Sequence, residues 1–215
     1  MAEPDLKFVH QFVPAAVRDI GITLLLLHGT GGDEHDLLPL GRELAPGAAL
    51  LSPRGRVLEH GMPRFFRRFS EGVFDIDDLK FQTHELNEFV RMAAEHYGFD
   101  EKRIVAVGYS NGANIAASLF LLHPHLLSGA ALFRPMVPFT PDVAPDLRRV
   151  KALLGAGKHD QIVPRENTGL LQELLTSFGA EVEVHWHPGG HELGQDDIAA
   201  ARKWLSRNFA ASQPR

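Results

Sequence analysis

A serine between two glycines is the first place where this sequence could do chemistry. Residues 108–112 read Gly-Tyr-Ser-Asn-Gly, directly after an apolar run at 103–107 and before residues spaced as on a helix. A strand, sharp turn and helix in this order lift a serine hydroxyl clear of a sheet, and the glycines avoid clashes where strand and helix crowd together. We predict that Ser110 is a nucleophile with a strained backbone. The alternative is that Ser110 only caps the helix.

An acid and a histidine follow the serine, each shortly after another apolar run. The run at 150–154 leads to Asp160, and the run at 182–186 leads to His191. A serine on such a turn has its partners in the order acid, then histidine, on loops after later strands. We predict that His191 takes the proton from Ser110 and returns it to the leaving group. Asp160 would orient the imidazole ring and stabilise its charged form.

A glycine-rich turn follows the apolar run at 22–27. Residues 28–32 read His-Gly-Thr-Gly-Gly, so backbone amides there can approach a substrate oxygen closely. We predict the backbone N–H groups of Thr30 and Asn111 as oxyanion donors, with His28 bracing the turn. Loss of one such donor typically costs about 2.7–4 kcal/mol. A phosphate site is the competing interpretation, but the turn lacks the Lys-Ser or Lys-Thr of a P-loop, and no cofactor is expected.

Other acids and histidines offer alternatives to these assignments. Asp142 and Asp146 follow the apolar run at 129–133, one strand too early for the expected acid. Two pairs of histidines have a spacing that places each pair on one side of an extended segment: His123 with His125, and His185 with His187. The sequence shows no matching carboxylate cluster beside either pair, so no metal site is predicted.

The candidate residues can meet only if a sheet places them along one of its edges. The sequence has the pattern of such a sheet. Short apolar runs alternate with stretches of helical spacing, which is typical of an α/β fold with a mostly parallel sheet and helices on both faces. Strands are expected at 8–13, 22–27, 48–51, 103–107, 129–133, 150–154 and 182–186. Helices are expected at 34–44, 79–98, 111–122, 166–178 and 196–209, with Gly98 ending the second. No linker is visible, so residues 1–215 are expected to form a single domain.

The long segment 53–78 has no clean periodicity. Loops of this length in compact domains are commonly functional, so we expect a wall of the substrate pocket here, either a fixed wall or a mobile lid. Five residues are the candidates: Met62, Phe65 and Phe66 for an apolar acyl or aromatic pocket, and Arg54 or Arg67 for a polar end of the substrate. The alternative is that the aromatic residues simply pack in the core.

Charge and composition exclude several classes of function. The net charge is −5 and the Lys and Arg residues are scattered, except for Arg64, Arg67 and Arg68, whereas nucleic-acid binding needs a concentrated basic surface. The chain has no cysteine, which excludes disulfides, thiolate metal sites and cysteine nucleophiles. Its apolar runs are far shorter than the roughly 20 residues of a membrane-spanning helix. Residues 1–7 lack the features of a secretory signal, so a cytoplasmic protein is expected.

Four motifs resemble those of the small carboxylesterase and phospholipase/acyl-protein thioesterase family: LLLLHGTGGDE, VGYSNGANIA, GKHDQIVP and GGHEL. The segment SPRGRVLEHGMPRFFRR is similar to that of a bacterial subgroup of hydrolases, some described as acting on hydroquinone-related compounds. The resemblance implies an α/β-hydrolase fold without a separate cap domain, no cofactor, and often a homodimer. It implies the same roles for Ser110, Asp160, His191, Thr30 and Asn111. Thr30 departs from the apolar residue that many relatives carry after His-Gly, so pocket polarity can differ.

The sequence therefore favours a serine hydrolase that cleaves small carboxylic esters through an acyl-enzyme. Thioesterase or lysophospholipase-type activity on the same site is one alternative. A ligand-binding protein without catalytic activity is another, because a fold alone does not establish an activity.

Overall fold

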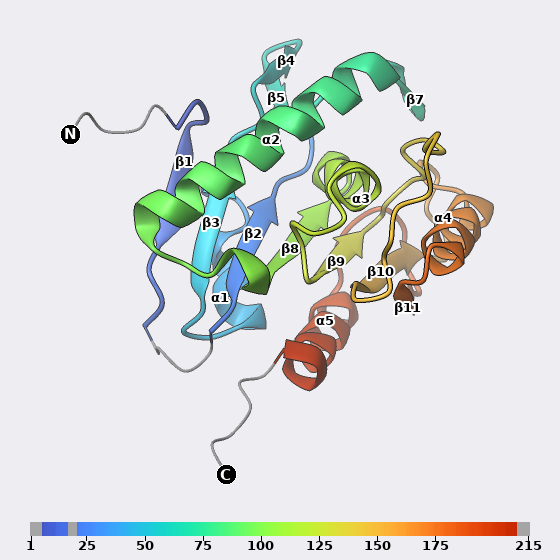
Figure 1. Cartoon of the computed structure of the whole chain (residues 1–215). Coiled ribbons are helices and arrows are strands. Elements are labelled where there is room, and N and C mark those ends of the chain that lie inside the picture. Colours follow the sequence, from blue (N-terminus) through green and yellow to red (C-terminus); the bar gives the residue numbers. More distant parts are fainter. Residues whose placement is uncertain (1–5, 17–20, 210–215) are drawn as a thin grey trace.

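The computed structural model describes residues 6–16 and 21–209. Seven strands form one sheet in the order β1-β3-β2-β8-β9-β10-β11, and every neighbouring pair is parallel except β1 with β3 (Figure 1). The strands are β1 (His10–Val13), β2 (Thr23–Leu27), β3 (Ala49–Pro53), β8 (Ile104–Tyr109), β9 (Gly129–Phe133), β10 (Lys151–Gly157) and β11 (Glu181–His187). Each overlaps one of the seven strands expected from the sequence.

The apolar strands contribute side chains to two separate hydrophobic cores, because alternate side chains of a strand point to opposite faces of the sheet. In β2, Leu25 and Leu27 pack into one core, and Leu24 and Leu26 pack into the other. All four side chains are fully buried. A continuous apolar run is therefore what a central parallel strand covered on both faces requires.

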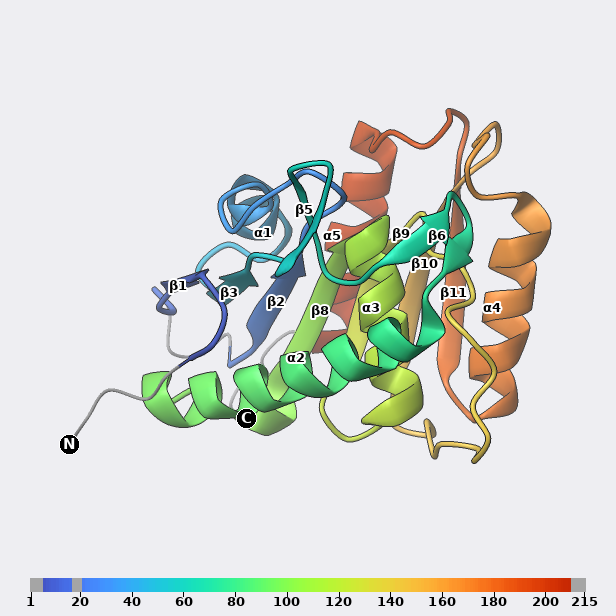
Figure 2. The ribbon, with the colours of Figure 1, turned by 90° about the horizontal axis from the view of Figure 1, so that it is seen from above.

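In the described part of the chain, five α-helices cover the two faces of the sheet: α1 (Leu38–Leu44), α2 (Ile76–Tyr97), α3 (Asn111–Leu122), α4 (Arg165–Ser177) and α5 (Gln195–Phe209). Apolar residues of α2, α3 and α4 belong to one core, and those of α1 and α5 belong to the other. Figure 2 shows α2 and α3 on the opposite side of the sheet from α1 and α5. Gly98 ends α2 in the left-handed conformation, with φ 72°, as expected. The α/β-hydrolase fold predicted from the sequence is thereby confirmed.

The segment between β3 and α2 contains four short strands that the sequence did not predict. They are β4 (Val57–Glu59), β5 (Met62–Arg64), β6 (Arg68–Ser70) and β7 (Val73–Phe74), paired as two small antiparallel hairpins. At the first hairpin turn, His60 and Gly61 both have positive φ, as two-residue hairpin turns require. Strands of two or three residues are too short to give an alternating pattern, so periodicity could not reveal them.

No helix within residues 6–16 and 21–209 has the length and apolar character needed to cross a membrane. The prediction of a cytoplasmic location used residues 1–7, of which residues 1–5 lie outside the described residues.

Candidate active site

Ser110 occupies a strained turn between β8 and α3. Its φ of 52° and ψ of −113° are rarely adopted by residues other than glycine, so the expected strain is confirmed. The backbone N–H of Ser110 donates to the carbonyl of Phe133, at 2.9 Å, which ties the turn to β9. A Cβ atom at Gly112 would lie 2.0 Å from the carbonyl oxygen of Leu27. Glycine is therefore required where α3 crosses the end of β2.

His191 and Asp160 complete a chain of hydrogen-bond contacts that begins at Ser110. The Nε2 atom of His191 lies 3.0 Å from Oγ of Ser110, and its Nδ1 atom lies 2.8 Å from Oδ2 of Asp160. With Nδ1 protonated, His191 donates to Asp160 and leaves Nε2 free to accept the serine proton. The other oxygen of Asp160 accepts from the backbone N–H groups of Ile162 and Val163, at 2.8 and 3.0 Å. The carboxylate is thereby fixed in orientation.

Backbone contacts bring the acid and histidine loops together. The N–H groups of Lys158 and His159 donate to the carbonyls of His187 and Gly189, at 2.8 and 2.9 Å. A Cβ at Gly157 would lie 2.1 Å from the carbonyl oxygen of Gly190. The close approach of the loops after β10 and β11 thus depends on a glycine at position 157.

A buried ion pair that was not predicted from the sequence anchors the histidine loop. Arg134 follows β9, is 1% exposed, and pairs with Asp197 of α5 at 2.7 Å. The same guanidinium donates to the carbonyls of Gly190 and Glu192, at 3.0 and 2.5 Å, on either side of His191. The sequence does contain an indication of this pair. Arg134 directly follows an apolar strand, and a charge buried there is costly unless it is paired.

His28 braces the glycine-rich turn, as expected. It is 1% exposed, its Nδ1 lies 2.7 Å from the carbonyl oxygen of Gly29, and its Nε2 accepts from the N–H of Gly55 at 2.9 Å. Burial lowers the pKa of His28 below its ordinary value, because desolvation disfavours the charged ring. The neutral ring therefore links the turn after β2 to the segment after β3.

The space beside Ser110 is small and polar. The cavity has a volume of about 30 Å³, and one water molecule needs about 10–15 Å³. Thr30 and Asn111 both line it, as do residues from four other parts of the chain. The lining residues are Thr30, Arg64, Arg68, Glu71, Gly72, Phe74, Ser110, Asn111, Asn114, Arg134, Met136, Ile162, Val163 and His191.

The structure places the five expected pocket residues elsewhere. Phe65 and Phe66 are 1% and 0% exposed and belong to the hydrophobic core, which is the packing alternative. Met62 is exposed, and its side chain lies near Gly31. The two arginines are engaged in ion pairs outside the cavity, Arg54 with Glu34 at 2.5 Å and Arg67 with Asp75 at 3.2 Å. The hairpins turn Arg64 and Arg68 toward Ser110 instead.

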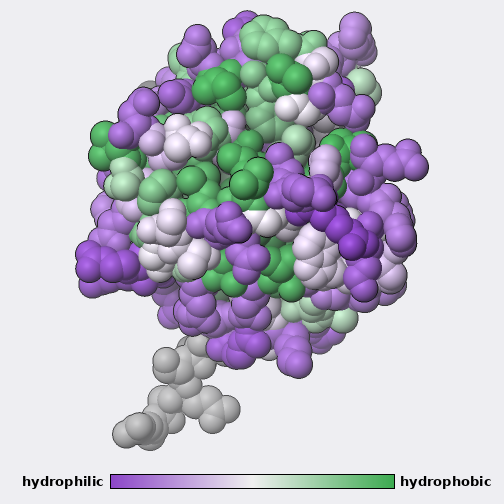
Figure 3. Space-filling model, turned by 90° about the vertical axis from the view of Figure 1, so that its right-hand side faces the viewer, coloured by the Kyte–Doolittle hydropathy of each residue, from purple (hydrophilic) through white to green (hydrophobic). Residues whose placement is uncertain are grey.

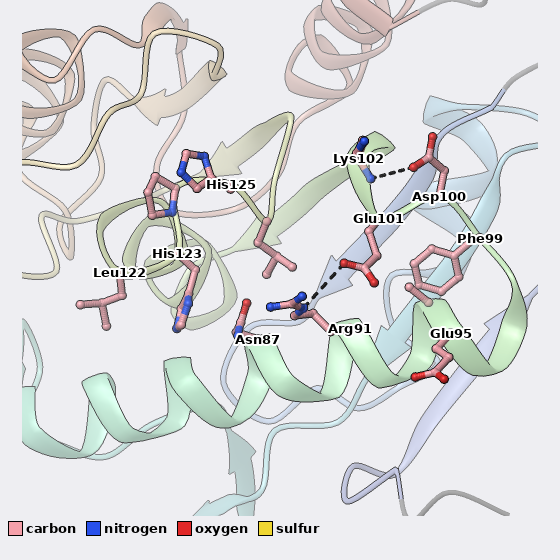
Figure 4. A pocket seen from close by; sticks show the side chains of 13 residues that line it. Asn87, Arg91, Glu95, Phe99, Asp100, Glu101, Lys102, Leu122, His123 and His125 are labelled. Carbon is pink, nitrogen blue, oxygen red and sulfur yellow. Dashed lines mark hydrogen bonds and ion pairs between the residues drawn. The ribbon is translucent and has the colours of Figure 1, made fainter.

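A larger hollow, of about 800 Å³, is lined by a separate set of residues. Figure 4 shows it from close by. Its walls come from α2, from the connection between α2 and β8, and from the loop after α3. Arg91 pairs there with Glu101 at 3.6 Å, and the backbone N–H of Lys102 donates to Asp100 at 2.9 Å. Neither serine nor threonine occurs among the lining residues that the structure describes, so the smaller cavity at Ser110 is the one with a nucleophile.

The histidine pair on β11 has carboxylate neighbours that the sequence did not reveal. His187 Nδ1 lies 2.7 Å from Asp196 Oδ1, and His185 Nε2 lies 3.3 Å from Asp196 Oδ2. The atoms of His187, Asp196 and Asp197 are close enough together to hold a metal ion. However, Asp197 is already paired with Arg134, whose charge opposes a cation there. The first turn of α5 thus supplies carboxylates beside this histidine pair, which the sequence did not predict.

The sheet, its helices and the serine on the turn after β8 define an α/β hydrolase. A model of the Phospholipase/Carboxylesterase family matches residues 10–209, and the chain belongs to that family. MhqD of Bacillus subtilis (strain 168), named a hydrolase, is 52% identical over 181 residues, which cover 84% of this chain and 90% of MhqD.

Solved structures agree with this family. The Bacillus cereus carboxylesterase superposes with a TM-score of 0.93 at 45% identity, over 95% of this chain and 96% of that one. The structure of YahD with malic acid superposes with a TM-score of 0.85 at 34% identity, over 94% of this chain and 99% of the YahD chain. The chain is a carboxylic ester hydrolase.

Proposed function

We propose that this enzyme cleaves small carboxylic esters through an acyl-enzyme on Ser110. The Ser110 oxygen attacks the ester carbonyl carbon while His191 takes the serine proton. The bond from the carbonyl carbon to the alcohol oxygen then breaks, and His191 gives that proton to the leaving alcohol. Water repeats the sequence on the acyl-enzyme, which releases the acid and restores the serine.

One observation carries this proposal: a single imidazole lies within hydrogen-bond distance of both a serine on a strained turn and a buried carboxylate. The two distances are 3.0 Å to Ser110 Oγ and 2.8 Å to Asp160 Oδ2. The Asp160 side chain is 1% exposed, so its charge acts on the ring with little screening by water. The rival acid Asp146 binds Arg148 instead, at 2.6 Å.

The developing oxyanion would be held by the backbone N–H groups of Thr30 and Asn111. Both residues line the cavity at Ser110. Asn111 is also the first residue of α3, where N–H groups have no partner within the helix and the helix dipole favours negative charge. Removing one such donor typically costs about 2.7–4 kcal/mol of transition-state stabilisation.

The acyl group is proposed to be short. A cavity of about 30 Å³ has no room for a long alkyl chain, and its walls carry polar groups such as Asn114 and Thr30. The relative YahD was solved with malic acid, a small carboxylic acid. Esters of short acids are therefore better candidates than lysophospholipids.

A fluorophosphonate probe tests the nucleophile directly. The probe should label the wild type at Ser110, and Ser110→Ala should lose both labelling and hydrolysis of ethyl butyrate. Ser206→Ala is the matched control, because Ser206 is an exposed residue of α5 and, among the residues that the structure describes, its hydroxyl bonds only to the carbonyl of Lys203. Labelling at another residue, or ester hydrolysis by Ser110→Ala at the wild-type rate, would refute the proposal. The same assay with thioesters of butyric acid then tests the alternative of thioesterase activity.

The protein is also proposed to be a cytoplasmic homodimer. Figure 3 shows apolar side chains in patches between polar ones on the face that carries α4. Exposed apolar residues in this part of the chain include Leu170 of α4 at 57% and Val143 at 82%. Light scattering coupled to size-exclusion chromatography measures the mass in solution, and a monomer at micromolar concentration would contradict the dimer.

A further inference from the structure

Two arginines of the segment 53–78 border the cavity at Ser110. Arg64 ends β5, Arg68 begins β6, and both line the space that Ser110 and His191 also line. We propose that these two guanidinium groups form an anion subsite, which selects esters that carry a second, ionised carboxylate. The inference rests on the proposed ester hydrolysis and names the substrate class for the same site.

Arg64 is built into the wall as a fixed donor. Its side chain is 3% exposed, its Nη1 donates to Thr30 Oγ1 at 2.6 Å, and its Nε donates to the carbonyl of Phe66 at 3.2 Å. These bonds hold the planar group beside the predicted oxyanion donor Thr30. Within the described residues no partner is found for Nη2, so this nitrogen is available to a ligand.

The positive charge of the pair is only partly balanced. Glu59 is the carboxylate that contacts both arginines, at 3.3 Å from Arg64 Nη1 and 3.0 Å from Arg68 Nε. Burial lowers the pKa of Arg64 below its ordinary value, and repulsion from the nearby Arg68 lowers it further. The third arginine at the cavity, Arg134, is already neutralised by Asp197. One further anion would therefore relieve the repulsion between Arg64 and Arg68.

A carboxylate fits this site better than a neutral acceptor does. Guanidinium groups bind carboxylates through parallel N–H···O bonds that are about twice as strong as bonds between neutral groups. Glu71 borders the same cavity from an exposed position, where water screens its charge. It opposes an incoming anion weakly, and its removal should strengthen the selectivity.

Matched pairs of esters test the subsite. Monoethyl succinate and ethyl levulinate share one acyl shape, but the first ends in a carboxylate and the second in a methyl ketone. Acetoxyacetate and acetoxyacetone make the same exchange on the alcohol side. For the wild type, the carboxylate member of at least one pair should have the higher kcat/KM, and that pair identifies the side of the ester that carries the anion. Equal values in both pairs would overturn the proposal.

Arg68→Gln is the diagnostic variant, because the Arg68 side chain is 26% exposed and, within the described residues, bonds only to Glu59. The ratio of kcat/KM between the charged and neutral esters should fall about tenfold or more, since bonds to charged groups are the strong ones. Arg67→Gln removes the same charge from the same segment outside the cavity, and it should leave the ratio unchanged. Glu71→Gln should raise the ratio. An equal loss on both esters in Arg68→Gln would show a merely structural role.

Binding to Ser110→Ala separates this proposal from the proposed reaction. Calorimetry should detect succinate binding to Ser110→Ala and much weaker binding to Ser110→Ala with Arg68→Gln. If succinate binds in this way while neither ester is hydrolysed by the wild type, the reaction is wrong and the subsite stands. If the neutral esters are hydrolysed but succinate binding does not depend on Arg68, the subsite is wrong and the reaction stands.

Discussion

The side chain of Asn111 accepts a hydrogen bond from the backbone N–H of Phe65, at 2.7 Å. Asn111 directly follows Ser110 in the chain, whereas Phe65 belongs to the hairpin segment that forms one wall of the cavity. Asn111 is 2% exposed, and within the described residues its Nδ2 atom has no partner. The bond therefore couples the nucleophile turn to the wall opposite it.

Asn111→Ala should destabilise the fold by about 1–3 kcal/mol, because it leaves the buried N–H of Phe65 without an acceptor. Urea unfolding measures the change. Asn87→Ala on α2 is the control, since Asn87 has no side-chain hydrogen bond within the described residues and alanine favours a helix. The backbone N–H at 111 remains, so kcat should fall much less than in Ser110→Ala. Equal stability of the two asparagine variants would contradict this coupling.

Gly112→Ala should abolish activity and destabilise the protein by more than about 3 kcal/mol, because its Cβ would overlap backbone atoms of Leu27. Gly169→Ala makes the same chemical change on α4, where a new Cβ meets no atom within 4 Å. That variant should be more stable than the wild type, by about 0.5–1 kcal/mol. Thermal unfolding and ester hydrolysis of both variants measure the difference. A folded, active Gly112→Ala protein would show that the turn has more room than the geometry indicates.

Arg134→Met should destabilise the protein by roughly 3–5 kcal/mol, since it leaves Asp197 buried and unpaired. It should also lower kcat at temperatures where the variant is folded, because the carbonyls beside His191 lose their donor. Arg148→Met breaks an exposed pair with Asp146 and should change neither property measurably. Denaturation midpoints and kcat of the two variants make the comparison. Similar results for both would mean that the buried pair does not anchor the loop.

Stability should decrease as the pH falls below about 6.5, the ordinary pKa of histidine. His28 has a lowered pKa in the folded protein, so the unfolded chain takes up a proton first and is favoured in acid. His28→Gln should reduce the slope of unfolding free energy against pH between the ordinary and the lowered pKa. Urea unfolding at several pH values from 8 to 5 tests this. An unchanged slope in His28→Gln would assign the acid sensitivity to other groups.

Much of the fold followed from local patterns. Continuous apolar runs such as 22–27 predict buried parallel strands, and the strand, Gly-Tyr-Ser-Asn-Gly and helix order predicts the strained conformation of Ser110. The short hairpins at 57–64 and 68–74 could not be predicted, because two or three residues show no period. Their pairing decides which side chains of the segment face the cavity.

Residue types and their order along the chain determined the proposed nucleophile, base and acid, because a parallel sheet brings the carboxyl ends of β8, β10 and β11 to one edge. Tertiary structure alone decided that Phe65 and Phe66 enter the core while Arg64 and Arg68 face Ser110. It also decided that Arg134 meets Asp197, 63 residues further along the chain. Such pairings depend on long-range packing, which no local spacing specifies.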